Sequence, residues 1–254
     1  MRSKPTRAAS PTASRLRLEP EPDGRDLGLG LALELSTRAG SVALRRGDVF
    51  GEELLDPGPA HASDLLPACT RLAERLGLRS LEPAWIAVGL GPGSFTGLRV
   101  AVAIALGLAR ASGAALVGLP SCDACFFALL APGETGTWIQ DARAGRAYSA
   151  RARRTREGDL EVLSAPRALG WDVLAAELDA RRATSANERF LVDEGAQRRL
   201  GFDSGVDATL ADPPRASALL ELARRQWRRA GPTEPTALRP LYLFEFGQPT
   251  GTTP

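Results

Sequence analysis

This chain of 254 residues contains one lysine, Lys4, and one histidine, His61. A P-loop needs a Gly-Lys-Ser or Gly-Lys-Thr sequence and a Schiff-base enzyme needs an active-site lysine, so the near absence of lysine excludes both chemistries. The sequence offers His61 no identifiable catalytic partner. We therefore interpret His61 as a surface residue at the start of a helix rather than as a catalytic base.

Cysteine is also scarce, with three residues in the chain. No apolar signal segment precedes them, which favours a reducing, cytoplasmic setting. Cys122 and Cys125 have the spacing of a redox or zinc pair, but they begin an apolar helical run and no second pair of ligands lies nearby. We expect buried core thiols and no bound metal.

Composition and net charge limit the classes of protein that remain possible. A hydrophobic content of 44% and a charged content of 24% are ordinary for a globular chain, and a net charge of +2 gives no general reason to expect nucleic acid. Apolar strand patterns alternate with helical patterns, which predicts an α/β protein with mixed sheets. We expect a disordered extension over 1–26, one lobe over 27–119 that is joined by a helix near 215–230, a smaller lobe over 120–214, and a C-terminal segment and tail over 231–254.

The most informative stretch runs from Gly91 to Arg99 and contains three glycines within seven residues. It lies between a predicted strand over 84–88 and a predicted helix over 94–111. A glycine turn at a helix N-terminus can hold a phosphate or carboxylate. The competing interpretation, which we favour, is a structural turn that leads into a tightly packed helix. The turn at Ser36 and Thr37 has the same two interpretations, phosphate contact or local hydrogen bonding.

The predicted helix over 94–111 has no charged residue between Val100 and Ala109. Small residues form two ridges along it, which would allow close approach of another helix. Arg110 interrupts the apolar run too soon for a membrane span. The first ridge contains Gly97, Ala101, Ala105 and Ala109, and the second contains Ala103, Gly107 and Ala111.

Five segments of the sequence are distinctive when taken together. They are Leu-Ala-Leu-Glu-Leu-Ser-Thr at 31–37, His-Ala-Ser-Asp-Leu-Leu-Pro at 61–67, Gly-Pro-Gly-Ser-Phe-Thr-Gly-Leu-Arg at 91–99, Asp-Ala-Arg-Ala-Gly-Arg-Ala-Tyr at 141–148 and Pro-Leu-Tyr-Leu at 240–243. Together they resemble the TsaB (YeaZ) family, the dimerisation subunit of the bacterial tRNA threonylcarbamoyladenosine machinery. The resemblance is strongest over 31–119 and patchy over 135–243.

The resemblance implies a two-lobed fold like that of actin and the Hsp70 ATPases, in a degenerate and non-catalytic form. It implies pairing with the catalytic paralogue TsaD, joined by the ATPase TsaE, in a complex that places a threonylcarbamoyl group on the adenosine beside the tRNA anticodon. ATP or ADP and a metal belong to the partner complex. The resemblance implies no membrane contact.

Two departures argue against catalysis by this chain. Ser121 and Cys125 stand where the resemblance places two metal-binding histidines of TsaD, and serine is a poor metal ligand. Glu34 stands where actin-like ATPases usually carry aspartate. Any nucleotide site is therefore vestigial, and its candidate residues are Glu34, Ser36, Thr37, Gly91, Gly93 and Ser94.

We predict that the helix over 94–111 and a helix over 61–78 form the surface that binds TsaD, or that pairs with itself in a homodimer. The predicted interface residues are Leu65, Leu66, Cys69, Leu72, Gly97, Ala101 and Ala105. The competing interpretation is that these residues face the chain's own sheet.

Two other function classes stay open. They are an actin-like small-molecule kinase or nucleotide-binding ATPase, and a glycoprotein endopeptidase-like metalloenzyme. A basic stretch could also contact tRNA phosphates, although alternating arginines on an exposed strand face are the simpler interpretation. This stretch contains Arg143, Arg146, Arg151, Arg153, Arg154 and Arg156.

Overall fold

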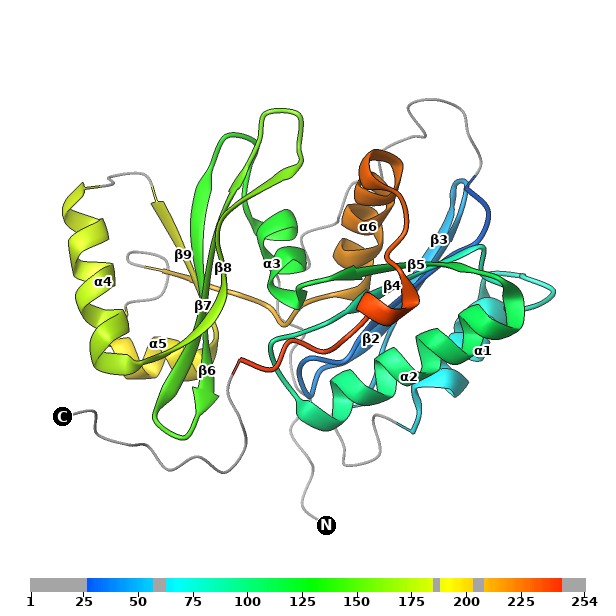
Figure 1. Ribbon diagram of the computed structural model, residues 1–254, viewed down its shortest axis with the longest axis horizontal. Coiled ribbons are helices and arrows are strands. Elements are labelled where there is room, and N and C mark those ends of the chain that lie inside the picture. Colours follow the sequence, from blue (N-terminus) through cyan, green and yellow to red (C-terminus); the bar gives the residue numbers. More distant parts are fainter. Residues whose placement is uncertain (1–26, 57–62, 185–187, 203–207, 244–254) are drawn as a thin grey trace, which may run out of the picture.

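In the computed structural model, the described residues are 27–56, 63–184, 188–202 and 208–243, and they form two α/β lobes, each built on a sheet (Figure 1). The expected disordered extension over 1–26, His61 and the tail over 244–254 lie outside the described residues. Two lobes, each with a mixed sheet and covering helices, confirm the fold class that the sequence predicts.

The first sheet has the strand order β3-β2-β1-β4-β5. The first three strands form an antiparallel meander, whereas β1, β4 and β5 run parallel. The carboxyl ends of β1 and β4 therefore lie side by side, and the turns that follow these strands meet there. The strands are β1 (Gly30–Glu34), β2 (Ser41–Arg46), β3 (Val49–Leu54), β4 (Trp85–Gly89) and β5 (Ala115–Leu119).

Helices cover both faces of this sheet, as the period-two alternation of strand side chains requires. Leu31 and Leu33 point to the face that is covered by α1 (Leu65–Arg75) and α2 (Phe95–Ser112). Ala32 points to the opposite face, which is covered by α6 (Ala216–Ala230). The helix expected near 215–230 thus packs on the first sheet.

The second sheet repeats the plan of the first, with the order β10-β9-β6-β7-β8. Strands β6, β7 and β8 form the antiparallel meander, and β6, β9 and β10 run parallel. Helices α4 (Trp171–Thr184) and α5 (Glu194–Leu200) lie on its outer side. The strands are β6 (Thr135–Arg143), β7 (Arg146–Arg154), β8 (Leu160–Gly170), β9 (Glu188–Val192) and β10 (Thr209–Leu210).

Helix α3 (Ser121–Leu129) lies between the two sheets, next to α6 (Figure 1). Cys122 and Cys125 face the second sheet, and Phe127 packs against the first sheet and α6. Burial raises the pKa of both thiols well above the usual range. The expectation that these cysteines belong to the core is confirmed.

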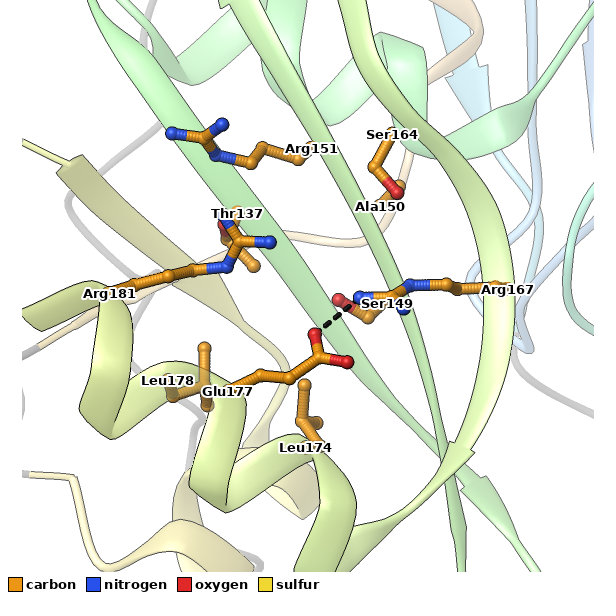
Figure 2. A pocket seen from close by; sticks show the side chains of 10 residues that line it. All are labelled: Thr137, Ser149, Ala150, Arg151, Ser164, Arg167, Leu174, Glu177, Leu178 and Arg181. Atoms are coloured by element: carbon orange, nitrogen blue, oxygen red, sulfur yellow. Dashed lines mark hydrogen bonds and ion pairs between the residues drawn. The ribbon is translucent and has the colours of Figure 1, made fainter.

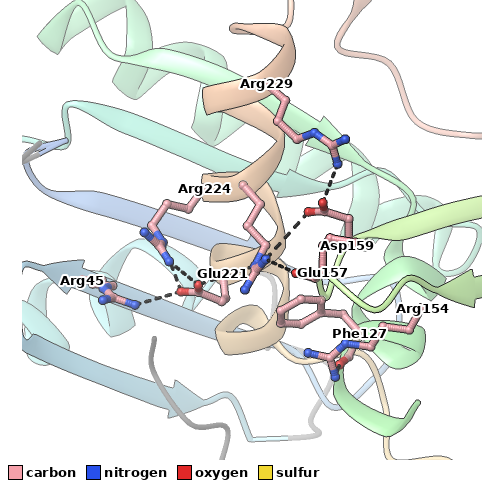
Figure 3. A network of polar contacts seen from close by, with 9 residues as sticks. Arg45, Phe127, Arg154, Glu157, Asp159, Glu221, Arg224 and Arg229 are labelled. Atoms are coloured by element: carbon pink, nitrogen blue, oxygen red, sulfur yellow. Dashed lines mark hydrogen bonds and ion pairs between the residues drawn. The ribbon is translucent and has the colours of Figure 1, made fainter. Parts of the chain in front are cut away.

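A network of charged side chains joins the lobes along α6 (Figure 3). Glu221 accepts hydrogen bonds from Arg45 of β2 and from Arg224, and all three side chains are buried. About two turns farther along α6 than Glu221, Arg229 pairs at 2.6 Å with Asp159 in the β7–β8 turn. Helix α6 therefore bridges a buried ion cluster in the first lobe and a partly exposed one in the second.

Candidate functional site

The glycine turn connects β4 to α2 in a conformation that depends on its glycines. Gly91 and Gly93 have φ angles of +94° and +156°, which residues with a Cβ rarely adopt. Ser94 then caps α2, because its hydroxyl accepts a hydrogen bond from the Gly97 backbone N–H at 3.2 Å. The predicted sequence of strand, glycine turn and capped helix is present.

The turn is packed directly against the end of β1. A Cβ on Gly93 would lie 2.1 Å from the Ser36 carbonyl oxygen, and one on Gly97 would lie 2.2 Å from that of Leu35. The Ser94 backbone N–H donates to the same Ser36 oxygen at 2.7 Å. Two of the three glycines are thus needed for contact between backbones, which supports the structural interpretation of the turn.

Glu34 ends β1 beneath this turn and is 1% exposed. Its Oε1 accepts the Ser36 backbone N–H at 2.7 Å, while its Oε2 has no hydrogen-bond partner among the described residues. Burial raises the pKa of Glu34, against the opposing effect of the hydrogen bonds from Ser36. The carboxyl group is therefore harder to ionise than that of an exposed glutamate, and it is cut off from solvent.

Backbone packing leaves no space around this carboxyl group on the β4 side. A Cβ on Gly89 would lie 1.9 Å from Glu34 Oε2. Thr37, at the outer end of the turn, is partly exposed, and its hydroxyl accepts the Ala39 backbone N–H at 3.2 Å. The structure thus brings Glu34, Ser36, Gly91, Gly93 and Ser94 together and gives Thr37 the turn hydrogen bond that the sequence suggests as an alternative to phosphate contact.

Comparison with known proteins gives two kinds of similarity. Residues 58–168 match the family model described as TsaD, tRNA N6-adenosine threonylcarbamoyltransferase. A crystal structure from Pseudomonas aeruginosa, described as an uncharacterized protein with similarity to peptidase YEAZ, superposes with a TM-score of 0.71 at 25% identity. YeaZ from Pseudomonas aeruginosa superposes with a TM-score of 0.68, also at 25% identity. Both alignments cover 85% of this chain and 100% of the other chain.

These similarities fit the TsaB/TsaD superfamily. The two lobes of the chain match the YeaZ fold and hence the actin-like fold of TsaD-type proteins. No curated protein sequence matches the chain significantly.

Ser121 and Cys125, which the resemblance sets against two histidines of TsaD, have structural contacts of their own. Ser121 Oγ accepts the Gly91 backbone N–H at 3.0 Å, and the Ser121 N–H donates to the Gly91 carbonyl at 2.7 Å. Cys125 Sγ lies 3.7 Å from the carbonyl oxygen of Asp212. Within the described ranges, no three His, Cys, Asp or Glu side chains are grouped as metal ligands. In the sequence, Ser121 stands out only as a mismatch to the TsaD pattern. In the structure, its two hydrogen bonds with Gly91 connect α3 to the glycine turn.

The residues expected to bind TsaD require a correction. Of the seven, only Leu66 is well exposed, at 43%. The other six are buried in the chain's own first lobe because α1 and α2 use these residues to cover the sheet: Leu65, Cys69, Leu72, Gly97, Ala101 and Ala105.

The exposed side of α2 carries the second small ridge instead. Only five of the 18 residues of α2 are buried, and Ala103, Gly107 and Ala111 are exposed. A Cβ on Gly107 would meet no atom within 4 Å. By length and composition alone α2 could cross a membrane, but its buried side is integrated into the first sheet.

The basic stretch over 143–156 is not one continuous free surface. Arg151 pairs with Glu188 at 2.7 Å, and Arg153 pairs with Glu161 at 3.4 Å. Arg154 Nη1 donates to the carbonyl oxygens of Phe127 and Leu130, both at 2.9 Å. These three arginines therefore serve the fold of the second lobe.

A cavity of about 10 Å³ lies between α4 and the second sheet (Figure 2). Arg167 of β8 pairs there with Glu177 of α4, and Arg151 on the opposite wall pairs with Glu188. A space of this size holds about one water molecule. The cavity is too small for a substrate.

Proposed function

We propose that this chain is a TsaB-type, non-catalytic subunit that binds a TsaD paralogue in the cytoplasmic synthesis of tRNA N6-threonylcarbamoyladenosine. TsaE completes the complex, tRNA is its substrate, and ATP or ADP and a metal belong to the partner subunits. The YeaZ-like fold and the TsaD-family match support this role. The buried Glu34 and the absence of histidine at positions 121 and 125 support a role without catalysis.

The observation that carries the proposal is the outer side of α2. Its exposed residues Ala103, Gly107 and Ala111 form a ridge of small residues, and the partly exposed Val100, Ile104 and Leu108 lie beside it. Ridges of this kind allow a second helix to pack closely. An apolar helix surface of this length is typical of a surface that is covered in the functional assembly.

The C-terminal segment extends this surface at the start of α2. The Phe95 and Tyr242 rings have centroids 5.1 Å apart, and Arg99 Nε donates to the Tyr242 hydroxyl at 2.9 Å. Tyr242 is 48% exposed. Aromatic and arginine side chains are enriched at binding surfaces, so this corner is a candidate anchor for the partner.

The test is co-purification and titration with the cognate TsaD. Gly107→Arg places a charge on this ridge, at a position where a Cβ meets no atom of the described residues within 4 Å. A charge buried in a packed interface costs several kcal/mol, so we expect affinity for TsaD to fall about 100-fold or more. The matched control is Ala176→Arg, on an exposed position of α4 in the other lobe, which should bind TsaD like the wild type.

Unchanged TsaD binding by folded Gly107→Arg would contradict the assignment of this surface. Failure of the wild-type chain to bind TsaD at all would contradict the proposed function. Without TsaD, the same side of α2 can pair two copies of the chain. Gly107→Arg should then convert a dimer to a monomer in sedimentation equilibrium, whereas Ala176→Arg should not.

The two competing function classes, a kinase or ATPase and a metalloenzyme, require other site features. A kinase or ATPase needs an ionised carboxylate exposed to bound nucleotide, and Glu34 is buried with a raised pKa. An endopeptidase-like metalloenzyme needs metal ligands, and Ser121 and Cys125 contact backbone groups instead. No contact among the described residues favours either class.

A further inference from the structure

A cleft of about 490 Å³ opens at the end of the second lobe and takes no part in the proposed TsaD contact. The β6–β7 turn, the start of α4 and the helix α5 enclose it, and these elements lie near one another in Figure 1. Its lining includes Asp141, Arg143, Trp171, Arg198 and Arg199.

Hydrogen bonds fix the walls of the cleft. The Asp193 carboxylate accepts the Ala196 backbone N–H at 2.7 Å and also the Asp141 backbone N–H, at 3.2 and 3.3 Å. A Cβ on Gly195 would lie 2.7 Å from Asp141 Cβ, so the turn and α5 are in close contact. The cleft therefore belongs to the folded structure of the lobe.

Positive charge dominates the lining. The one carboxylate among the lining residues is that of Asp141, which accepts the Arg143 backbone N–H at 2.7 Å. The side chains of Arg143 and Arg199 form no ion pair with any residue in the described ranges. Arg198 reaches only Glu194, at 3.6 Å, in a pair that is about three-quarters exposed.

The Trp171 ring limits where the Arg199 guanidinium group can lie. The Arg199 guanidinium group is 5.9 Å from the centre of the Trp171 ring. A cation–π contact of this kind holds the planar group in place while its N–H donors stay available for a ligand. Three guanidinium groups thus converge on one cleft with little negative charge to neutralise them.

We propose that this cleft binds phosphate groups through Arg143, Arg198 and Arg199. Guanidinium groups bind phosphate oxygens with paired hydrogen bonds, which suits a cleft of this charge. An RNA backbone and a free nucleotide both supply this chemistry. RNA is the source that we infer, and this choice rests on the proposed function.

The experiment measures binding of a fluorescein-labelled anticodon stem-loop RNA to the full chain by anisotropy at several salt concentrations. Arg143→Ala/Arg199→Ala should lower the affinity at least tenfold and reduce the salt slope by about one per arginine that contacts phosphate. Arg198→Glu is a second variant and should weaken binding further by repulsion. The matched control, Arg156→Ala, removes an exposed arginine beyond the opposite end of β7 and should leave binding unchanged.

Parallel titrations with ATP and with inorganic phosphate distinguish the sources. Arginine-dependent binding of RNA supports the proposal with RNA as the source, and arginine-dependent binding of ATP alone supports it with a nucleotide as the source. The proposal would be overturned if the variants bound each probe, RNA and ATP, as tightly as the wild type does. It would also be overturned if the wild type bound neither probe.

A TsaD titration separates this result from the proposed function. The cleft variants leave α2 unchanged, so they should bind TsaD like the wild type. A wild type that binds phosphate probes but not TsaD would contradict the proposed function while leaving the cleft assignment intact.

Discussion

The Gly93 backbone lies against the carbonyl oxygen of Ser36, so closely that a Cβ on Gly93 would be 2.1 Å from that oxygen. The adjacent Ser94 N–H donates to the same oxygen at 2.7 Å. Close backbone contacts therefore join the turn before α2 to the turn after β1.

Gly93→Ala should destabilise the protein by about 2–5 kcal/mol, because it adds both a steric overlap and an unfavourable φ angle. The matched control is Gly107→Ala, where a Cβ meets no atom and a helix interior gains about 0.5–1 kcal/mol from alanine. Thermal and urea unfolding of both variants give the comparison. A Gly93→Ala protein as stable as the wild type would show that the turn is not packed as described.

Glu221→Gln tests the buried ion cluster. Arg45 and Arg224 both donate to this carboxylate, and each of the three side chains is at most 5% exposed. Removal of the negative charge that faces both guanidinium groups should cost about 3–5 kcal/mol. The control is Glu161→Gln, whose pair with Arg153 is about half exposed and should be worth less than about 1 kcal/mol. Similar unfolding midpoints for the two variants would contradict this account.

Much of the fold could be predicted because its determinants are local. The helix expected near 215–230 is α6 (Ala216–Ala230), and the strand expected over 84–88 is β4 (Trp85–Gly89). Ser94 caps α2 as its position before the helix suggests. Elements with less periodicity were missed. The seven-residue α5 has an Asp193 cap and a final Gly201, which are recognisable helix ends, but it has no apolar stripe.

The composition of the two small ridges of α2 could not show which ridge is buried and which is exposed. Both ridges are apolar, and packing on the sheet determines which one is covered. One pattern could have shown the answer. Arg99, Ala103, Gly107 and Arg110 share one side of the helix at spacings of four, four and three residues, and all four are exposed. The charged side chains of Arg99 and Arg110 indicate that this side of α2 faces outward. The arginine cleft depends on three separate segments, so no local pattern predicts it.

The stability of the protein should fall as pH rises from about 4 to about 7, partly because of Asp123. Burial raises the pKa of Asp123 from 3.8 to about 7, and the Cys122 thiol lies 3.7 Å from its Oδ1. Over this pH range the native state retains a proton that the unfolded chain has lost, so the native state is progressively disfavoured. The contribution at neutral pH is up to about 4 kcal/mol.

Asp123→Asn removes this titration. The stability difference between wild type and variant should therefore change across the pH range, in favour of the variant at higher pH. Glu34, whose pKa is also raised, titrates in both proteins and cancels in the difference. Urea unfolding at several pH values measures this difference, and parallel pH profiles would contradict the role given to Asp123.

The last prediction concerns nucleotide chemistry. Glu34 lies at the end of β1 beside the glycine turn, and its carboxyl group is 1% exposed, with Gly89 packed against Oε2. A group that must contact magnesium or phosphate cannot do so from this position without movement of β4. We therefore expect the purified chain to show no ATP hydrolysis near the ~10 s⁻¹ that is common for enzymes. A phosphate-release assay on wild type, Glu34→Ala and the surface control Glu74→Ala decides the matter. Turnover that is lost in Glu34→Ala but kept in Glu74→Ala would show that the site is active, whereas weak activity equal in all three proteins would point to a contaminating ATPase.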